Sequence, residues 1–585
     1  MNPTLEFAKQ EMKRYGVEAE LVREPGLLSF EIRNTGGKKE IAYSSEVEAL
    51  YGIYDFAERF CGYTFFEPGR DVFDAASIGS IPEGTAVPQR KPLLKRRGLI
   101  QEFPFNDETP ALFDWMAKNK LNYLLVWMKY YDDIPEEFKC AAALRGITIE
   151  SGHHNFNYWI PGEKYGKEHS EFLAMLGGKR ITPSGTMTEL LMSEQLCTSN
   201  PDLRAEIVKN MLEYAEKHPE LETLSLVPND GFGWCECPEC ARLCPPENKG
   251  DFYSISEHVP KAGTIYHDLV RDVAARLHRT RPDLKLSFCA YINYCAPSPG
   301  FTLEPGVMVH MAPYWRCVNH TIDDPKCPIN SGYANDIRAW CACKHGGDVN
   351  IYEYFMGVNF YLGLPMIHFE EMFHELAWYS KTGVDGILTQ FHVPNWTVYG
   401  MNYLFMARAA RGEKMTETIS RLFRRLFGTD EKEAGEFYHA LKRLPTEAGS
   451  CHIPYPYSLF SRTGVESYEK LHVMAQKLSR KAPENRFRQE LTTWTDYLLH
   501  FKKLFDDYRR GTVSENQLSV FLEWIHSNRN TRIFVHDRFD WFFDEWKRAV
   551  RKHLPWLHYN IDWEDAYIRK HEKLWRETDS RKNNP

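Results

Sequence analysis

The sequence has no long run of apolar residues and no excess of positive charge. Within its 585 residues, no apolar stretch approaches the ~18 residues that a membrane-spanning helix needs. The 72 Lys and Arg residues are outnumbered by 80 Asp and Glu residues, which gives a net charge of −8. Neither pattern favours a membrane or a nucleic acid as the partner. The hydrophobic content of 43% is ordinary for a globular protein, and the length allows several domains.

The first residues also lack the apolar core of a secretory signal. The segment from Met1 to Gly16 is polar and charged, so we expect a cytoplasmic protein. In that compartment most of the 14 Cys residues would be reduced thiols.

Several catalytic motifs are missing as well. The sequence has no Gly-x-Ser-x-Gly motif, no Walker-type phosphate loop and no Gly-x-Gly-x-x-Gly after a strand. These absences remove the main support for a serine hydrolase, a P-loop nucleotide enzyme or a dinucleotide enzyme. Aromatic residues, by contrast, make up 14% of the chain. They either fill the core or provide stacking surfaces for the C–H faces of sugar rings.

Eight short apolar runs that end in polar or aromatic residues form the main pattern in the middle of the chain. Most of them are separated by a stretch with helical periodicity. This alternation predicts a parallel sheet, and eight repeats predict a (β/α)8 barrel with its functional side chains at the C-terminal strand ends. The runs are Lys95–Gln101, Asn122–Met128, Gly146–Gly152, Thr223–Asp230, Leu284–Tyr291, Val307–Tyr314, Asp348–Phe355 and Val384–Phe391.

The barrel is predicted to occupy residues 93–412, between a small α/β domain (1–92) and a helical C-terminal domain (413–585). After residue 412, apolar residues recur at the i, i+3, i+4 spacing of amphipathic helices. The helices expected there are Thr416–Phe427, Lys432–Leu444, Ser467–Lys481, Glu484–Arg510 and Glu515–Ser527.

The first domain has its own strand and helix patterns. Leu27–Arg33 and Glu40–Ser44 are predicted strands, and Ser44 or Ser45 is placed to cap a helix that ends near Cys61. Residues 77–92, with their Gly and Pro content, are predicted to be the connection to the barrel.

Two acidic residues at predicted strand ends are the main catalytic candidates. Asp230 ends the fourth run, and Gly231 after it allows a sharp turn away from the barrel. Glu353 lies near the end of the seventh run, where apolar surroundings would raise its pKa and suit it to acid catalysis. The alternatives are an Asp that caps the next segment and a Glu held in a structural salt bridge.

Other polar and aromatic residues follow the same strands and are predicted to line the pocket. The adjacent His153 and His154 would bind substrate hydroxyls, or a metal if a third ligand lay nearby. Paired carboxylates in a barrel mouth with such a lining match glycoside hydrolysis best. The predicted lining residues are Asn229, His153, His154, Trp234, Tyr291, Tyr314, Arg316, Gln390 and Asn395, and further strand-end candidates are Glu102, Glu150 and His392.

Four cysteines within ten residues form a candidate metal site. They are Cys235, Cys237, Cys240 and Cys244. Four thiolates can surround one tetrahedral Zn²⁺ and leave no open position, so this zinc would be structural, and we expect catalysis to need no cofactor. The Cys-x-Cys start departs from the usual Cys-x-x-Cys pair, and a loop of free or locally bridged cysteines is the alternative.

Several stretches together resemble a bacterial family called domain of unknown function 4838. They are Gly152–Phe156, Leu176–Arg180, Gln195–Pro201 and Pro228–Cys240, in this order. The family is related to glycoside hydrolase family 163, whose activity is endo-β-N-acetylglucosaminidase. Glu46–Gly69 also resembles the small α/β domain that precedes the barrel in family 20 hexosaminidases and family 67 α-glucuronidases.

The resemblance implies a glycoside hydrolase barrel with carboxylate catalysis. We expect it to act on oligosaccharides, most of all on N-acetylglucosaminides. Glu353 would be the general acid/base, and Asp230 would position an acetamido group or act as base or nucleophile. Family 20 enzymes carry Asp-Glu where this chain has Asn229-Asp230, and the eighth run contains Gln390 rather than a carboxylate. These departures keep open the hypothesis of a non-catalytic carbohydrate-binding barrel. An α-glucuronidase-like hydrolase is another alternative. A metal-dependent hydrolase that uses His153 or His154 is a further alternative.

Overall fold

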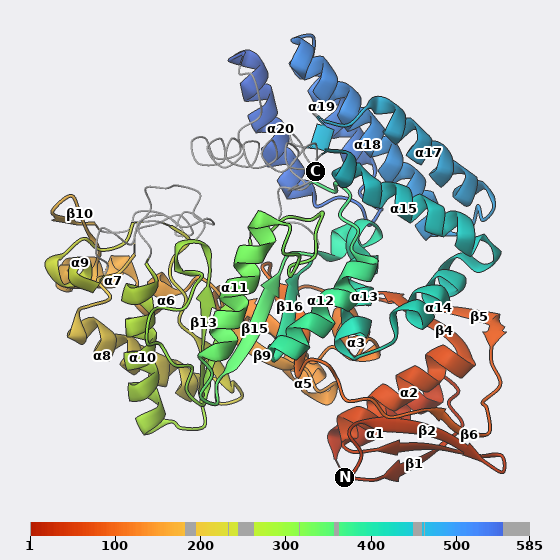
Figure 1. Cartoon of the computed structure of the whole chain (residues 1–585), viewed down its shortest axis with the longest axis horizontal. Helices are drawn as coiled ribbons and strands as arrows, with labels where there is room; N and C mark the ends of the chain where they lie inside the picture. Colours follow the sequence, from red (N-terminus) through yellow and green to blue (C-terminus); the bar gives the residue numbers. More distant parts are fainter. Residues whose placement is uncertain are drawn as a thin grey trace.

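In the computed structural model the chain forms an N-terminal α/β unit, a closed barrel of eight parallel strands and a C-terminal group of helices (Figure 1). This arrangement confirms the predicted fold class. The structure describes residues 2–181, 195–231, 233–243, 262–314, 316–355, 362–448, 459–460 and 462–553. Within these ranges, none of the helices combines the length and the apolar character needed to span a bilayer.

The N-terminal unit is a mixed sheet covered by two helices. Helix α1 (Pro3–Arg14) packs on α2 (Glu46–Phe60), and α2 contacts the sheet. Ser45 caps α2 by accepting a hydrogen bond from the backbone N–H of Glu48, which confirms the predicted start of this helix. The sheet has the order β1 (Glu20–Arg23), β3 (Lys38–Tyr43), β2 (Phe30–Thr35) and β6 (Gly84–Val87), and β4 (Cys61–Glu67) pairs with β5 (Arg70–Ile78).

Residues 77–92 were predicted to be a connection only, but they also contain strand residues. Strand β5 extends to Ile78, and β6 pairs antiparallel with β2 at the edge of the sheet. The partner of β6 lies about 50 residues earlier in the chain, as in the pair Ile32 and Val87. The local Gly and Pro content therefore does not reveal this strand.

The barrel closes in chain order, and its last strand pairs with its first. Every strand lies within one of the eight predicted runs. The fourth strand is the shortest, so Asn229 and Asp230 lie beyond it in the following loop. The strands are β7 (Arg96–Gln101), β8 (Tyr123–Trp127), β9 (Thr148–Gly152), β12 (Thr223–Ser225), β13 (Lys285–Ala290), β14 (Val307–Met311), β15 (Asp348–Glu353) and β16 (Gly386–Gln390).

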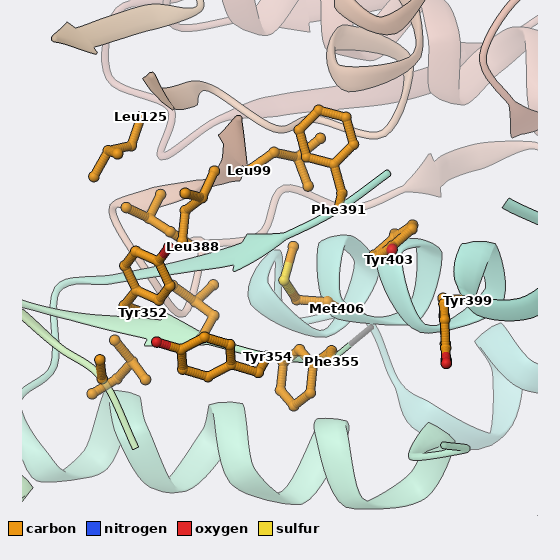
Figure 2. Close-up of a cluster of buried hydrophobic side chains, with 14 of the residues drawn as sticks. Leu99, Leu125, Tyr352, Tyr354, Phe355, Leu388, Phe391, Tyr399, Tyr403 and Met406 are labelled. Atoms are coloured by element: carbon orange, nitrogen blue, oxygen red, sulfur yellow. The ribbon is translucent and has the colours of Figure 1, made fainter. Parts of the chain in front are cut away.

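Helices surround the barrel (Figure 1), although the connection from β13 to β14 contains only the short helical turn Ile292–Tyr294. Helix α13 (Trp396–Ala410) is buried on all sides, which matches its apolar sequence. Figure 2 shows Tyr399, Tyr403 and Met406 of this helix with side chains from β15, β16 and the residues that follow them. The other barrel helices of at least nine residues are α3 (Thr109–Lys118), α5 (Glu136–Leu144), α8 (Pro201–Lys217), α10 (Gly263–Thr280), α11 (Pro328–Ala342) and α12 (Phe369–Thr382).

The C-terminal helices pack against the barrel near the end of its seventh strand. The Trp494 indole N–H donates to the backbone oxygen of Gly363 at 2.7 Å, and the Tyr497 hydroxyl donates to that of Leu362. The five predicted helices are present, and α20 lies in the same region, for which the periodicity also predicts helices. These helices are α14 (Met415–Phe427), α15 (Glu431–Ala448), α17 (Val465–Arg480), α18 (Arg486–Arg510), α19 (Glu515–Ser527) and α20 (His536–Arg551).

A buried charge network joins the N-terminal unit to the barrel. Arg408 of α13 is fully buried, and its guanidinium lies 2.7 Å from the carboxylate of Glu58 on α2 and 3.3 Å from that of Glu413. The same guanidinium donates to the side-chain oxygen of Asn119 at 2.9 Å. A charge removed from water is stable only when it is paired in this way, so the network fixes α2 against the barrel.

Arg408→Met should lower the free energy of unfolding by about 3–5 kcal/mol, because it leaves the buried Glu58 without its cationic partner. Urea denaturation followed by circular dichroism measures the change. The control is Lys9→Gln, which removes an exposed pair with Glu6 (3.0 Å) and should cost about 0–1 kcal/mol. Equal urea midpoints for the two variants would contradict a stabilising role for the network.

Candidate functional site

The pleat of the strands determines which side chains reach the mouth of the barrel. Successive side chains on a strand point to opposite faces. On β15, Tyr352 points inward, where its hydroxyl meets Glu102 at the end of β7, two strands away, whereas Glu353 points outward to Tyr379 of α12. The same alternation turns Gln390 at the end of β16 inward, where its amide also meets Glu102.

Glu102, directly after β7, is the carboxylate at the centre of the mouth. The Tyr352 hydroxyl donates to its Oε1 at 2.6 Å, the Gln390 amide donates to the same atom, and His153 Nε2 lies 3.2 Å away. Burial alone would raise the pKa of Glu102, but the hydrogen bonds from His153 and Tyr352 outweigh it and lower this pKa to about 2. Glu102 is therefore ionised at neutral pH.

His153 holds a strained position beside Glu102. Its φ of 69° lies in the left-handed region, which a residue with a side chain adopts only when the surroundings force it. Its ring stacks on Trp127 with centroids 4.5 Å apart, and its Nε2 lies 2.9 Å from the Tyr352 hydroxyl. Burial and the neighbouring His154 lower the pKa of His153 to about 4, so the imidazole is neutral at pH 7. Backbone strain of this kind concentrates at functional sites.

Asp230 is the second carboxylate near the mouth. Burial raises its pKa above the ordinary value, the charge of Glu102 adds to the increase, and His154 opposes it. Gln195 holds the backbone on both sides of this residue. Its amide nitrogen donates to the backbone oxygens of Asn229 (2.6 Å) and Gly231 (2.9 Å), and its Oε1 accepts from the Asn229 N–H at 3.0 Å. Asp230 is therefore fixed although it lies in a loop.

Aromatic rings form one wall of the mouth. Tyr314 is half-buried, and its ring meets the rings of Tyr291 (5.5 Å) and Tyr354 (5.2 Å) edge to face. His154 continues the wall, 6.1 Å from the Tyr291 ring. Rings in this arrangement offer apolar surface with hydroxyl groups at its edge, which suits the mixed apolar and polar surface of a sugar.

Glu353 and Arg316 do not face the mouth, which corrects the predicted placement of both. Glu353 is fully buried, its Oε1 lies 2.5 Å from Arg316 Nη1, and the Tyr379 hydroxyl donates to it at 3.0 Å. Arg316 also pairs with Glu375 of α12. Burial would lower the pKa of Arg316, but these two carboxylates raise it well above its ordinary value. Glu353 therefore makes the structural salt bridge that the sequence analysis considered as the alternative.

Three further residues that were predicted to line the pocket have buried side chains that contact other parts of the protein. Trp234 is 5% exposed and contacts the rings of Tyr266 and Tyr294. Asn229 is 2% exposed, and its Oδ1 accepts from a backbone N–H at 3.3 Å. Asn395 precedes α13 and accepts a hydrogen bond from a tyrosine of that helix. These contacts show that the three side chains stabilise the surrounding structure and do not face a ligand.

Three of the four predicted metal ligands lie together in the structure. Cys235, Cys237 and Cys240 converge, and Cys197, 40 residues before Cys237, joins them. Cys244 lies outside the described residues. In the described part of the chain, no converging group of three metal-ligating side chains includes His153 or His154, so the structure supplies no third ligand for the metal-dependent alternative.

Sequence reasoning missed several residues that build the site. Tyr352 and Trp127 are not among the predicted lining residues, and Gln195 occurs only in one of the stretches that carry the family resemblance. The alternation of side chains along β15 is the signal that would have separated Tyr352 from Glu353. No local pattern marks Gln195, because its partners lie 34 and 36 residues later in the chain.

Glu353→Gln should lower the free energy of unfolding by roughly 3 kcal/mol, because Arg316 loses one of its two buried carboxylate partners. Thermal and urea unfolding measure the loss. The matched control is Glu370→Gln at the start of α12, which removes a more exposed pair with Lys442 (2.7 Å) and should cost about 0–1 kcal/mol. A Glu353→Gln variant as stable as the control would argue against a structural pair.

Comparisons with known proteins agree with this architecture. Solved structures similar to this chain include a family 89 glycoside hydrolase from Clostridium perfringens in complex with PUGNAc (TM-score 0.57, 12% identity, 90% of this chain and 65% of that chain). The same organism's family 89 enzyme, in complex with its substrate GlcNAc-α-1,4-galactose, gives a TM-score of 0.56 at 13% identity, over 90% of this chain and 64% of that one. At such identities the likeness shows the fold alone, and this chain spans less than two thirds of the length of those structures.

Two further comparisons concern sequence. A search among curated proteins finds no match. Residues 80–426, which contain the whole barrel, match the family described as domain of unknown function DUF4838. The chain belongs to this family.

Proposed function

We propose that the protein is a glycoside hydrolase whose active site is the barrel mouth with Glu102 and Asp230. The observation that carries the proposal is the position of these two carboxyl groups at the same end of the barrel, in surroundings that shift their pKa values in opposite directions. The pKa of Glu102 is lowered to about 2, whereas that of Asp230 is raised. A pair of carboxyl groups of which one stays ionised and the other holds a proton longer is what cleavage of a glycosidic bond requires.

The two carboxyl groups take different roles. Asp230, with the raised pKa, donates a proton to the leaving oxygen. Glu102 stays ionised and acts as the base or nucleophile that faces the positive charge developing on the sugar. The hydrogen bonds from Tyr352 and Gln390 hold its carboxylate in place, so little reorganisation is needed in the transition state. Glu353 takes no part in the chemistry.

The substrate we propose is an oligosaccharide with an N-acetylglucosamine unit at the cleaved bond. The family resemblance and the fold shared with an enzyme bound to GlcNAc-α-1,4-galactose support this choice. The tyrosine wall supplies stacking surface for the sugar ring.

A uronide is the second candidate substrate. Lys129, which follows β8, places its ammonium 4.7 Å from the Trp127 ring centroid and 4.8 Å from that of Tyr130, at the same end of the barrel as Glu102. A cation held there would pair with the carboxylate of a glucuronide.

A panel of substrates tests the proposal. Aryl N-acetylglucosaminides of both anomers, aryl glucuronides and N-glycan-derived oligosaccharides are incubated with the wild-type protein, Asp230→Asn, Glu102→Gln and Glu353→Gln. We expect turnover of an N-acetylglucosaminide and a loss of about 10²–10⁴-fold in kcat/KM for Asp230→Asn, the usual contribution of a general acid. Glu102→Gln should lose at least as much, and Glu353→Gln should keep its kcat/KM per folded molecule within a few-fold.

The pH profile identifies the role of Asp230. A general acid must be protonated, so the rate should fall as pH rises through the raised pKa of Asp230, and Asp230→Asn should lack this alkaline limb. Because the pKa of Glu102 is about 2, its protonation should limit the rate only in strong acid. Sugar binding without turnover across the panel would favour the non-catalytic binding protein, and full activity in Asp230→Asn would contradict the assigned acid.

A further inference from the structure

Four buried thiols converge beside the loop that carries Asp230. The Sγ atoms of Cys197, Cys235, Cys237 and Cys240 all lie within 4.8 Å of one another, and no residue of the four is more than 6% exposed. All four are free cysteines, and the Sγ atoms of Cys197 and Cys237 are 3.6 Å apart. A tetrahedral ion with metal–sulfur bonds of about 2.3 Å sets its sulfurs about 3.8 Å apart, close to this separation.

Hydrogen-bond donors point at the sulfur atoms from outside the cluster. The backbone N–H of Met175 lies 3.3 Å from Cys235 Sγ, and Arg180 Nη1 lies 3.5 Å from the same atom. The Ser199 hydroxyl is 3.0 Å from Cys240 Sγ. Donors of this kind stabilise thiolates and form the outer shell that orients metal ligands.

We propose that Cys197, Cys235, Cys237 and Cys240 bind one Zn²⁺ ion as a structural site. Four sulfur ligands in a closed tetrahedral arrangement suit zinc and leave no position for water or substrate. Binding converts four thiols into four zinc-bound thiolates and releases four protons, with no change in oxidation state. Cys197 thus comes from a different loop from the other three ligands, and the site does not require Cys244.

The ion would join two barrel loops at the candidate active site. Cys197 precedes α8 in the connection after β9, whereas the other three ligands follow β12. Gln195, two residues before Cys197, holds the backbone of Asn229 and Gly231 on either side of Asp230. Zinc at this place would therefore maintain the position of Asp230, and this last step rests on the proposed function.

Metal content tests the site without any assay of activity. The full chain, purified after expression with added zinc and without chelators, is analysed by mass spectrometry for metals. We expect one zinc per chain in the wild type and in Cys140→Ser, which alters an exposed cysteine on α5, and background zinc in Cys197→Ser. Cys317→Ser is the second comparison, because Cys317, His320 and Cys327 also converge and this variant should keep its zinc.

If Cys197→Ser does not fold, cobalt replacement and thiol counting on the wild-type protein test the metal site instead. Co²⁺ bound by four thiolates in the wild type should give the strong visible bands of tetrahedral coordination together with a thiolate-to-metal charge-transfer band. A thiol reagent should modify four more cysteines after a chelator is added than before. Absence of zinc from the wild type, disulfides among the four cysteines, bound iron, or zinc lost only in Cys317→Ser would overturn the proposal.

Gln195→Ala separates the zinc site from the proposed catalysis. This variant keeps all four cysteines, so it should keep its zinc while its kcat/KM falls because Asp230 is no longer held. Zinc in the wild type without any glycosidase activity would leave the metal site standing and would contradict only the proposed function. Unchanged kcat/KM in Gln195→Ala would overturn the link between the ion and Asp230.

Discussion

Closure of eight parallel strands into one barrel is the constraint on which the rest of the structure depends. The closed hydrogen-bond register fixes the direction of each strand, and the pleat then divides its side chains between the interior and the surrounding helices. Glu102 and Gln390 meet in the mouth because β7 and β16 are neighbours in this register. Tyr352 reaches Glu102 from β15, on the far side of β16 from β7, although 250 residues separate the two in the chain.

The same constraint divides the buried charges into two kinds. The Arg316 guanidinium pairs with both Glu353 and Glu375, the Arg408 guanidinium pairs with Glu58, and both groups lie between elements. Inside the barrel, Glu150 accepts hydrogen bonds from Tyr123 (2.7 Å) and Ser287 and lies 3.0 Å from His310. Asp230 differs in its neighbours: burial raises its pKa, and the charged groups that act on it are the mouth residues His154 and Glu102 rather than a buried arginine. Such a carboxyl group is suited to exchanging its proton with a ligand.

The sequence predicts elements better than it predicts the partners of single side chains. Eight apolar runs and the Ser45 cap were enough for the barrel and for α2, because each depends on local periodicity or on one local hydrogen bond. The direction of the Glu353 side chain depends on the alternation along β15, which turns Tyr352 inward and Glu353 outward, and its position at a strand end does not show this. The role of Gln195 depends on contacts between distant loops, which composition and spacing do not encode.

The central claim is that a sugar binds in the barrel mouth between Glu102 and Asp230. A crystal structure of the protein with an N-acetylglucosamine-type iminosugar tests it most directly, since the ring cation of such a compound imitates the charge of the glycosidic transition state. We predict that the ring nitrogen lies against the Glu102 carboxylate, with Asp230 at the leaving-group side and the ring of Tyr314 against the sugar. An inhibitor bound elsewhere while it still abolishes turnover, or bound against Glu353, would contradict the account.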